Sequence, residues 1–287
     1  MTSRVVVTLD GAVLDPTEPV LHADDLAAVR GDGIFETVLI REGRACRLDA
    51  HLARLARSAA MLDLAEPDVD AWRRAVDVAL AQWEKTGGGE GAMRLLLSRG
   101  REGADGAETA LVMVSAVADR VTQARLEGVS ALTLNRGFSI DATQQSPWAL
   151  LGAKTLSYAT NMAALRHAAR EGFDEVVFRS IEGQVLEGPR SSVLAVVDRR
   201  MVTPPVEHGV LRGTTVDALF EVAGDAGFDC AHEPLRVADL ILADSVWLIS
   251  SVTLAARVHT LDTTHLKEMP SDRVVRELVD TAVARHR

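Results

Sequence analysis

The sequence has few cysteines, no long apolar run and no excess of positive charge. Cys46 and Cys230 are far apart and match no disulfide framework or metal-ligand spacing, which indicates a reducing compartment such as the cytoplasm. No apolar run approaches the ~20 residues of a membrane-spanning helix, and the first residues lack the apolar core of a signal peptide. The net charge of -10 argues against a nucleic-acid or anionic membrane partner. We therefore expect a cytoplasmic protein without a metal site.

Lysine is also scarce, because the chain has 28 arginines but only three lysines, Lys85, Lys154 and Lys267. Lys154 is the only charged residue between Pro147 and Asn161, in a chain that elsewhere uses arginine for positive charge. Arginine keeps its proton near neutral pH, whereas a lysine amine in apolar surroundings can be neutral and act as a nucleophile or form a Schiff base. The alternative is a lysine whose stem packs while its amine reaches water, and composition alone leaves that alternative open.

The order of strands and helices indicates an α+β protein with two domains. The chain has 287 residues, 47% hydrophobic and 25% charged, which is enough for two globular domains. Strands group into hairpins rather than alternating with helices, as is typical of the α+β class. The polar stretch 118–124 is the predicted joint between a smaller N-terminal domain, 1–118, and a larger C-terminal domain, 125–287. Strands are predicted at 4–9, 12–14, 36–40, 45–48, 92–98, 109–117, 129–134, 175–179, 184–186, 193–197 and 246–250, and helices at 51–62, 69–84, 154–170, 214–226 and from 271 onward, with a loop at 136–148.

Six short motifs follow one another along the chain. They are Gly31-Asp-Gly-Ile-Phe-Glu-Thr37, His51-Leu-Ala-Arg-Leu55, Lys154-Thr-Leu-Ser-Tyr-Ala-Thr-Asn161, Leu186-Glu-Gly-Pro-Arg-Ser-Ser192, Leu211-Arg-Gly-Thr-Thr215 and Leu248-Ile-Ser-Ser251. In this order they resemble the class IV aminotransferase family, the fold-type IV pyridoxal-phosphate enzymes, which include branched-chain and D-amino-acid aminotransferases and 4-amino-4-deoxychorismate lyases. The motifs cover nearly the whole chain. The resemblance implies two α/β domains joined by a short linker, and a pyridoxal 5'-phosphate cofactor.

The resemblance implies cofactor roles for three charged residues. Lys154 would hold the cofactor as an aldimine and then carry a proton to and from the substrate carbon. Glu187 would face the pyridine nitrogen and keep it protonated, although a turn residue before Gly188 and Pro189 is the alternative. Arg54 would bind the phosphate with its planar fork, whereas helical periodicity alone places it on a solvated helix face.

A phosphate site at the start of the helix predicted at 214–226 has a physical reason beyond the resemblance. Free backbone N–H groups and the helix dipole attract an anion there, and the threonine hydroxyls add donors, while capping of the helix by Thr214 is the alternative. Ser192 stands where many relatives carry asparagine, and Tyr158, the only tyrosine, is expected one helical turn after Lys154. The further cofactor-binding residues that the resemblance implies are Ser191, Ser192, Leu211, Gly213, Thr214, Thr215, Ser250 and Ser251. Tyr158 is expected either beside the cofactor or in the core, and Ser250 and Ser251 are alternatively the polar end of a strand.

The substrate side of the site is less well defined by the sequence. Phe35 stands where D-amino-acid aminotransferases place a substrate-binding tyrosine. The segment Ser98-Arg-Gly-Arg-Glu-Gly103 lacks their Arg-x-His carboxylate trap and looks closer to the aminodeoxychorismate lyases. Arg99, Arg101 and Arg257 are candidates for the substrate carboxylate, and each is alternatively a loop or surface arginine.

The resemblance is strongest to the lyase-type members of the family. It implies a 4-amino-4-deoxychorismate lyase that acts on a small amino substrate and releases pyruvate, leaving 4-aminobenzoate, as in folate biosynthesis. An aminotransferase of D-amino acids or branched-chain amino acids shares every step up to proton removal and stays open, as does a cofactor-binding protein without turnover. The resemblance also implies a homodimer, with the active site between the two domains and close to the partner subunit.

Overall fold

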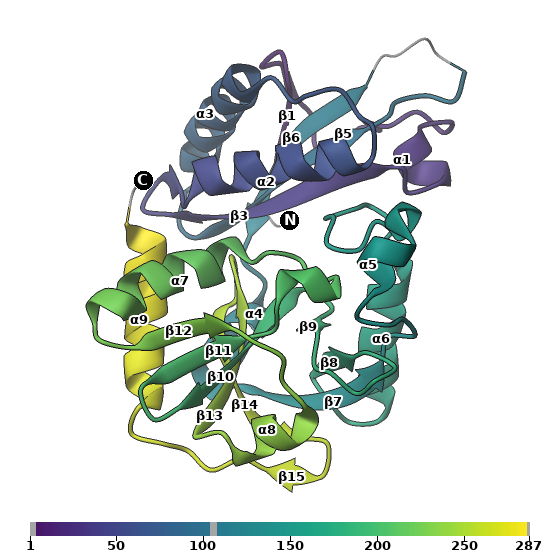
Figure 1. Ribbon diagram of the computed structural model, residues 1–287. Coiled ribbons are helices and arrows are strands. Elements are labelled where there is room, and N and C mark those ends of the chain that lie inside the picture. The colour runs from purple at the N-terminus through teal and green to yellow at the C-terminus, as the bar shows by residue number, and fades with distance from the viewer. Residues whose placement is uncertain (1–3, 104–107, 286–287) are drawn as a thin grey trace. The chain divides into compact units, whose positions relative to one another are not determined.

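The computed structural model of the protein describes residues 4–103 and 108–285 (Figure 1). Its described residues group into two units. Unit 1 contains residues 4–118 without the gap, together with Ala153–Tyr158, and unit 2 contains Asp119–Gly152 and Ala159–Arg285. The short segment that carries Lys154 therefore belongs with the N-terminal part of the chain, although the sequence analysis assigned it to the C-terminal domain.

Unit 1 is a sheet packed against two helices. Its elements are β1 (Arg4–Thr8), β2 (Val13–Leu14), α1 (Leu26–Val29), β3 (Gly33–Arg41), β4 (Arg44–Ala45), α2 (Leu48–Met61), α3 (Val69–Lys85), β5 (Gly91–Ser98) and β6 (Thr109–Ala116). The described strands pair antiparallel in the order β2-β1-β6-β5-β3-β4. The predicted first hairpin is present, since Val6 pairs with Leu14, and α3 begins after Asp68, whose side chain accepts from the N–H groups of Asp70 and Ala71.

Strand β3 positions the site residues of unit 1. It pairs with β5 along its length, from Gly33 opposite Ser98 to Ile40 opposite Gly91. Side chains alternate between the two faces of a strand, so Ile34, Glu36 and Val38 share one face, and all three are fully buried. Phe35 points to the other face. Because α2 contacts β3, residues of α2 reach the Glu36 side of the strand.

Unit 2 is built on a larger, mixed sheet. Its strands are β7 (Val129–Asn135), β8 (Glu175–Arg179), β9 (Glu187–Gly188), β10 (Ser191–Val197), β11 (Arg200–Thr203), β12 (Asp229–His232), β13 (Ser245–Ser250), β14 (Leu254–Leu261) and β15 (Thr264–His265), and its helices are α4 (Asp119–Glu127), α5 (Ala142–Gln145), α6 (Ala159–Arg170), α7 (Thr214–Asp225), α8 (Val237–Leu242) and α9 (Asp272–Ala284), with 3-10 turns at Pro147–Ala149 and Val206–His208. The described strands run β12-β11-β10-β13-β14-β7-β8, with β9 paired to β10 and β15 to β14.

The core of unit 2 lies along β10 and β13. Five consecutive residues of each strand are buried, so both faces of these strands are covered, and this explains their continuous apolar sequences. Helices α7 and α9 pack on each other and on β13 and β14, and α6 packs on β7 and β8. The predicted α+β class is confirmed.

Three regions differ from the sequence predictions. Residues 119–124, predicted as a polar linker, form the first part of α4, where Val121 is buried. The predicted helix 154–170 is shorter, because α6 begins only at Ala159 and the preceding residues are extended beside β3, with Thr155 bridged to Ile34. The predicted loop 136–148 contains the short helix α5.

Candidate active site

The backbone of Lys154 is held on both sides by unit 1. Its N–H donates to the Ser58 hydroxyl of α2 at 3.1 Å, and its carbonyl accepts from the Phe35 N–H of β3 at 3.0 Å. These bonds explain why the residue is not helical, since its N–H and carbonyl serve α2 and β3 instead of a helix ladder. The backbone position of Lys154 is consequently set by two regular elements, α2 and β3.

One aromatic ring lies against the Lys154 amine, and a second ring packs against the first. The Nζ atom lies 4.5 Å from the centre of the Phe35 ring, and the Tyr158 ring meets the Phe35 ring edge-on at 5.5 Å and 87°. The sequence placed Tyr158 one helical turn after Lys154, which is wrong because neither residue is in a helix. Tyr158 nevertheless reaches the same place, through Phe35. An aromatic face beside the amine supplies attraction for its cation and excludes water from one side.

A buried ionic cluster lies on the opposite face of β3. The Glu36 carboxylate accepts from Arg54 Nε and Nη2, each at 2.7 Å, and from His51 Nδ1 at 2.7 Å. The relative exposures are 0% for Glu36, 1% for His51 and 6% for Arg54. Arg54 is therefore not on a solvated helix face, and one edge of its guanidinium is oriented by Glu36 as a bidentate partner.

The charges within this cluster follow from its burial and hydrogen bonds. Burial alone would raise the pKa of Glu36, but the hydrogen bonds and charge of Arg54, together with the hydrogen bond from His51, outweigh it and lower the pKa to about 2. Burial lowers the pKa of His51 below its ordinary value despite the nearby Glu36. His51 is thus neutral at pH 7, with its proton on Nδ1, because an ionised carboxylate can only accept.

In unit 2, hydroxyl groups gather at the start of helix α7. The Ser251 hydroxyl lies 3.4 Å from the hydroxyls of both Thr214 and Thr215, which are 5% and 4% exposed. The helix cap is Gly213, without a side-chain capping bond, and a Cβ on it would lie 2.5 Å from the Ser192 hydroxyl. A larger residue at position 213 would displace the Ser192 hydroxyl. Backbone N–H groups, a helix dipole and hydroxyl donors together form a cradle suited to a phosphate.

Glu187 is held next to this region by a backbone donor. Its Oε2 accepts from the Leu211 N–H at 3.1 Å, and β9, which carries it, pairs Glu187 with Ser192. Leu211 therefore acts through its backbone, orienting the Glu187 carboxylate. The alternative of a simple turn residue does not apply to Glu187, because it lies in a strand.

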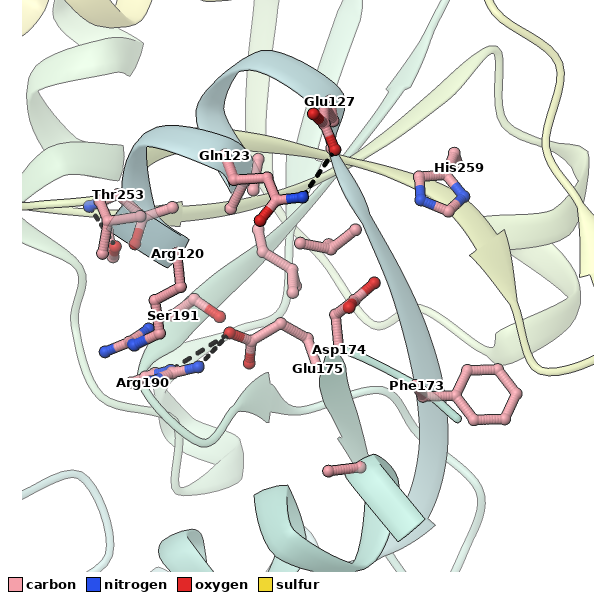
Figure 2. Close-up of a pocket in the computed structure, with 18 residues that line it drawn as sticks. Arg120, Gln123, Glu127, Phe173, Asp174, Glu175, Arg190, Ser191, Thr253 and His259 are labelled. Carbon is pink, nitrogen blue, oxygen red and sulfur yellow. Dashed lines mark hydrogen bonds and ion pairs between the residues drawn. The ribbon is translucent and has the colours of Figure 1, made fainter. Parts of the chain in front are cut away.

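Ser191 and Ser250 face a different part of unit 2. Both line a cavity of about 380 Å³ that also contains Glu175, Arg190 and His259 (Figure 2). Since side chains alternate along β10, Ser191 points away from Ser192 and Gly213. The sequence grouped all the serines of these motifs together, whereas the structure places Ser192 and Ser251 at the α7 cradle and Ser191 and Ser250 in this cavity.

The three arginines proposed for the substrate carboxylate all have protein partners in the structure. Arg257 is 6% exposed and donates from Nε to Asp272 at 2.6 Å and from Nη2 to the carbonyls of Leu266 and Lys267, which ties β14 to the start of α9.

Arg99 and Arg101 also have protein partners at their guanidinium nitrogens. Arg101 makes a bidentate pair with Asp24 on the surface. Arg99 uses Nε, Nη1 and Nη2 on Asp32 and on the carbonyls of Leu62 and Asp63. These partners could not be recognised from the neighbouring sequence, because each lies more than 30 residues away along the chain.

Glu36, His51 and Ser58 had no predicted role, and the structure brings them near Lys154. Glu36 had a signal of the same kind as Lys154, since it is an isolated charge within the apolar strand Gly33–Ile40. Ser58 had no signal, because its contact with Lys154 joins residues 96 positions apart.

The chain belongs to the class IV aminotransferase family, whose model matches residues 33–261. It is 56% identical, over 99% of this chain and 100% of the relative, to the bifunctional aminodeoxychorismate lyase / D-amino acid transaminase of Mycobacterium tuberculosis. A hypothetical aminotransferase from the same organism, solved in a PLP-bound form, matches with a TM-score of 0.96 and 56% identity over 98% of this chain and 99% of that one. A fold IV-transaminase from Curtobacterium pusillum matches with a TM-score of 0.93 and 38% identity over 99% and 100%. The family resemblance of the motifs is confirmed.

Among residues 4–103 and 108–285, no helix is both long and apolar enough to cross a membrane.

Proposed function

We propose that the protein is a pyridoxal-phosphate-dependent 4-amino-4-deoxychorismate lyase. The main support for the cofactor is Lys154. Its backbone is hydrogen-bonded to α2 and β3, and its amine lies 4.5 Å from the centre of the Phe35 ring. The residues present fit the group: an amine for its aldehyde, the Glu187 carboxylate for its ring nitrogen, and the cradle at Gly213 for its phosphate. The substrate is proposed from the relative at 56% identity, whose name includes this lyase activity.

Each residue has a part in this proposal. When bound, pyridoxal phosphate supplies an electron sink for the charge left on the substrate carbon. Lys154 holds the cofactor through Nζ until the substrate amine replaces it, and then takes the proton from the carbon that bears nitrogen. Glu187, oriented by the Leu211 N–H, keeps the ring nitrogen protonated. Ser192, Thr214, Thr215 and Ser251 bind the phosphate, and Arg54 adds a positive charge fixed by Glu36.

Cofactor binding is tested with the purified protein and borohydride. The protein should be yellow, and borohydride should fix the cofactor on Lys154, identified by peptide mass spectrometry. Lys154→Ala should abolish both fixation and turnover. Lys85→Ala is the matched control, since Lys85 ends α3 far along the chain from these motifs and should leave both unchanged. A colourless protein that never takes up pyridoxal phosphate would refute the proposal.

The reaction is tested with aminodeoxychorismate and no added keto acid. Release of pyruvate and 4-aminobenzoate is expected. If only mixtures of an amino donor and a keto acid turn over, the protein is an aminotransferase instead. That second candidate, with D-amino acids as donors, has its own support, because the relative's name joins both activities. A protein that binds the cofactor and turns over neither substrate would be a binding protein on this fold.

We also propose a cytoplasmic homodimer that acts in folate biosynthesis. The support is the two unpaired cysteines, the net charge of -10 and the family membership. Light scattering after size exclusion should give twice the 30.8 kDa of the chain. A mass of one chain would exclude the dimer.

A further inference from the structure

The lysine segment is bound to a turn as well as to helix α2. Beyond the two backbone bonds of Lys154, the Leu156 N–H donates to the Gly33 carbonyl at 2.8 Å, and the Ser157 hydroxyl donates to the Gly31 carbonyl at 3.1 Å. Both of these carbonyls lie in the turn at 31–33, where the chain enters β3. The position of Lys154 thus depends on how this turn sits relative to α2, which supplies Ser58.

The turn and the lysine segment are closely packed against each other. A Cβ on Gly33 would lie 2.7 Å from the Leu156 side chain, and one on Gly31 would lie 2.9 Å from the Ser157 hydroxyl. The packing of buried Gly33 against Leu156 is close enough to transmit a displacement rather than absorb it. A shift of the turn would therefore move the lysine segment with it.

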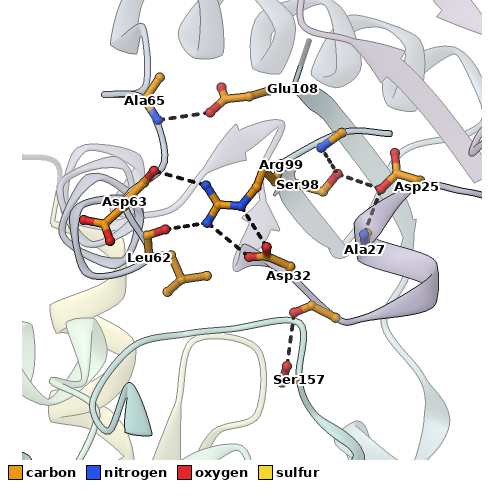
Figure 3. A network of polar contacts seen from close by, with 12 residues as sticks. Asp25, Ala27, Asp32, Leu62, Asp63, Ala65, Ser98, Arg99, Glu108 and Ser157 are labelled. Carbon is orange, nitrogen blue, oxygen red and sulfur yellow. Dashed lines mark hydrogen bonds and ion pairs between the residues drawn. The ribbon is translucent and has the colours of Figure 1, made fainter. Parts of the chain in front are cut away.

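Arg99 joins the turn to the end of α2 (Figure 3). Its Nε and Nη2 donate to the Asp32 carboxylate at 2.7 and 3.3 Å. Its Nη2 also donates to the Leu62 carbonyl at 2.6 Å, and its Nη1 donates to the Asp63 carbonyl at 3.2 Å. Leu62 and Asp63 follow directly on α2. We call Arg99 with these three partners the Arg99 clamp.

We propose that Arg99 is a positioning residue for Lys154. The Arg99 clamp holds the 31–33 turn and the end of α2 at one separation. The turn binds Leu156 and Ser157 of the lysine segment, and α2 binds the Lys154 N–H through Ser58. A planar guanidinium can reach a carboxylate and two carbonyls at once, which a lysine ammonium in its place cannot do with the same geometry. The inference rests on the proposed function, since its consequence concerns the bond between Lys154 and the cofactor.

The test compares two cofactors on the same variants. Pyridoxamine phosphate has an amine in place of the aldehyde and forms no covalent bond with a lysine, so it reports only on the rest of the cofactor site. Arg99→Ala should lower the ratio of pyridoxal phosphate affinity to pyridoxamine phosphate affinity by about tenfold or more, because a displacement of about 1 Å can cost a reacting group ~100-fold. Both affinities are measured by fluorescence titration of folded apoprotein, and fixation by borohydride is timed in parallel.

Arg101→Ala is the matched control. Arg101 is two residues away and makes a bidentate pair with Asp24, which is not bonded to the lysine segment in any described contact, so its removal should leave the ratio unchanged. Asp32→Asn should reproduce the fall seen in Arg99→Ala, and the double variant should be no worse than either, because both break one clamp. If Arg99→Ala does not fold, Arg99→Lys replaces it, with a smaller fall in the ratio expected.

Three outcomes would overturn the inference. Equal weakening of both cofactors in Arg99→Ala would mean that Arg99 supports the fold only, and unchanged affinities for both cofactors would mean that the clamp does not reach Lys154. A wild-type protein that shows no borohydride fixation would overturn the proposed function, and this inference with it. The first two outcomes leave the proposed function standing.

Discussion

Replacing Glu36 with glutamine removes the negative charge of the buried cluster while keeping the size of the side chain. Burial would raise the pKa of Glu36, but Arg54 and His51 lower it from 4.5 to about 2. Each pKa unit corresponds to about 1.4 kcal/mol of preference for the ionised form. Glu36→Gln should therefore lower the free energy of unfolding by about 3 kcal/mol at pH 7.

The cost should depend on pH in a defined window. Because the folded-state pKa is lowered, the stability from ionised Glu36 is fully present above pH 4.5 and is lost as the pH falls toward 2. Near pH 3 the difference between wild type and Glu36→Gln should shrink to about 1 kcal/mol. The measurement is urea unfolding of the apoprotein at both pH values, with hydrogen exchange at β3 reporting on unit 1 alone.

Glu90→Gln is the control for this experiment. Glu90 pairs with Arg41 at the same 2.7 Å, but the two side chains are 31% and 25% exposed, so the pair should contribute less than about 1 kcal/mol. A cost for Glu36→Gln below about 1 kcal/mol at pH 7, or one that is equal at pH 7 and pH 3, would refute the reasoning.

Three further predictions concern single contacts. Because the pKa of His51 is lowered in the folded state, the free energy of unfolding should fall as the pH drops below 6.5, the ordinary pKa of histidine. Urea unfolding at pH 7.5 and 5.5 should show a smaller fall for His51→Asn than for the wild type. Gly33→Ala would place a Cβ 2.6 Å from a carbonyl oxygen of β5, so thermal unfolding should show a loss of about 1–3 kcal/mol, unlike Gly224→Ala, where nothing lies within 4 Å. Arg257→Met should lower the free energy of unfolding in urea by about 3–5 kcal/mol, because it leaves Asp272 buried without its partner. KM should stay unchanged in the folded fraction, and a raised KM would indicate that Arg257 binds substrate.

The sequence by itself determined the family and the class of fold, and it singled out Lys154 as the candidate cofactor lysine. These follow from short-range signals: an isolated charge among apolar residues at Lys154, a Gly-Thr-Thr start to α7, and motifs in a fixed order. Residues close in sequence meet in a helix start or a turn whatever the rest of the chain does. For this reason the Asp68 cap and the α7 cradle were predictable from the sequence. The family match confirms that the motifs resemble those of the class IV aminotransferases.

Only the tertiary structure decided which charged groups face one another. Arg54, Arg99 and Arg257 looked alike as candidate anion ligands, yet their partners Glu36, Asp32 and Asp272 hold them in three different ways. The faces of β10 likewise separate Ser191 from Ser192, although the two are adjacent in the chain. The reason is physical: hydrogen bonds and burial depend on distances set by sheet pairing and packing over many residues, and the same packing keeps Lys154 out of the helix that its local sequence favoured.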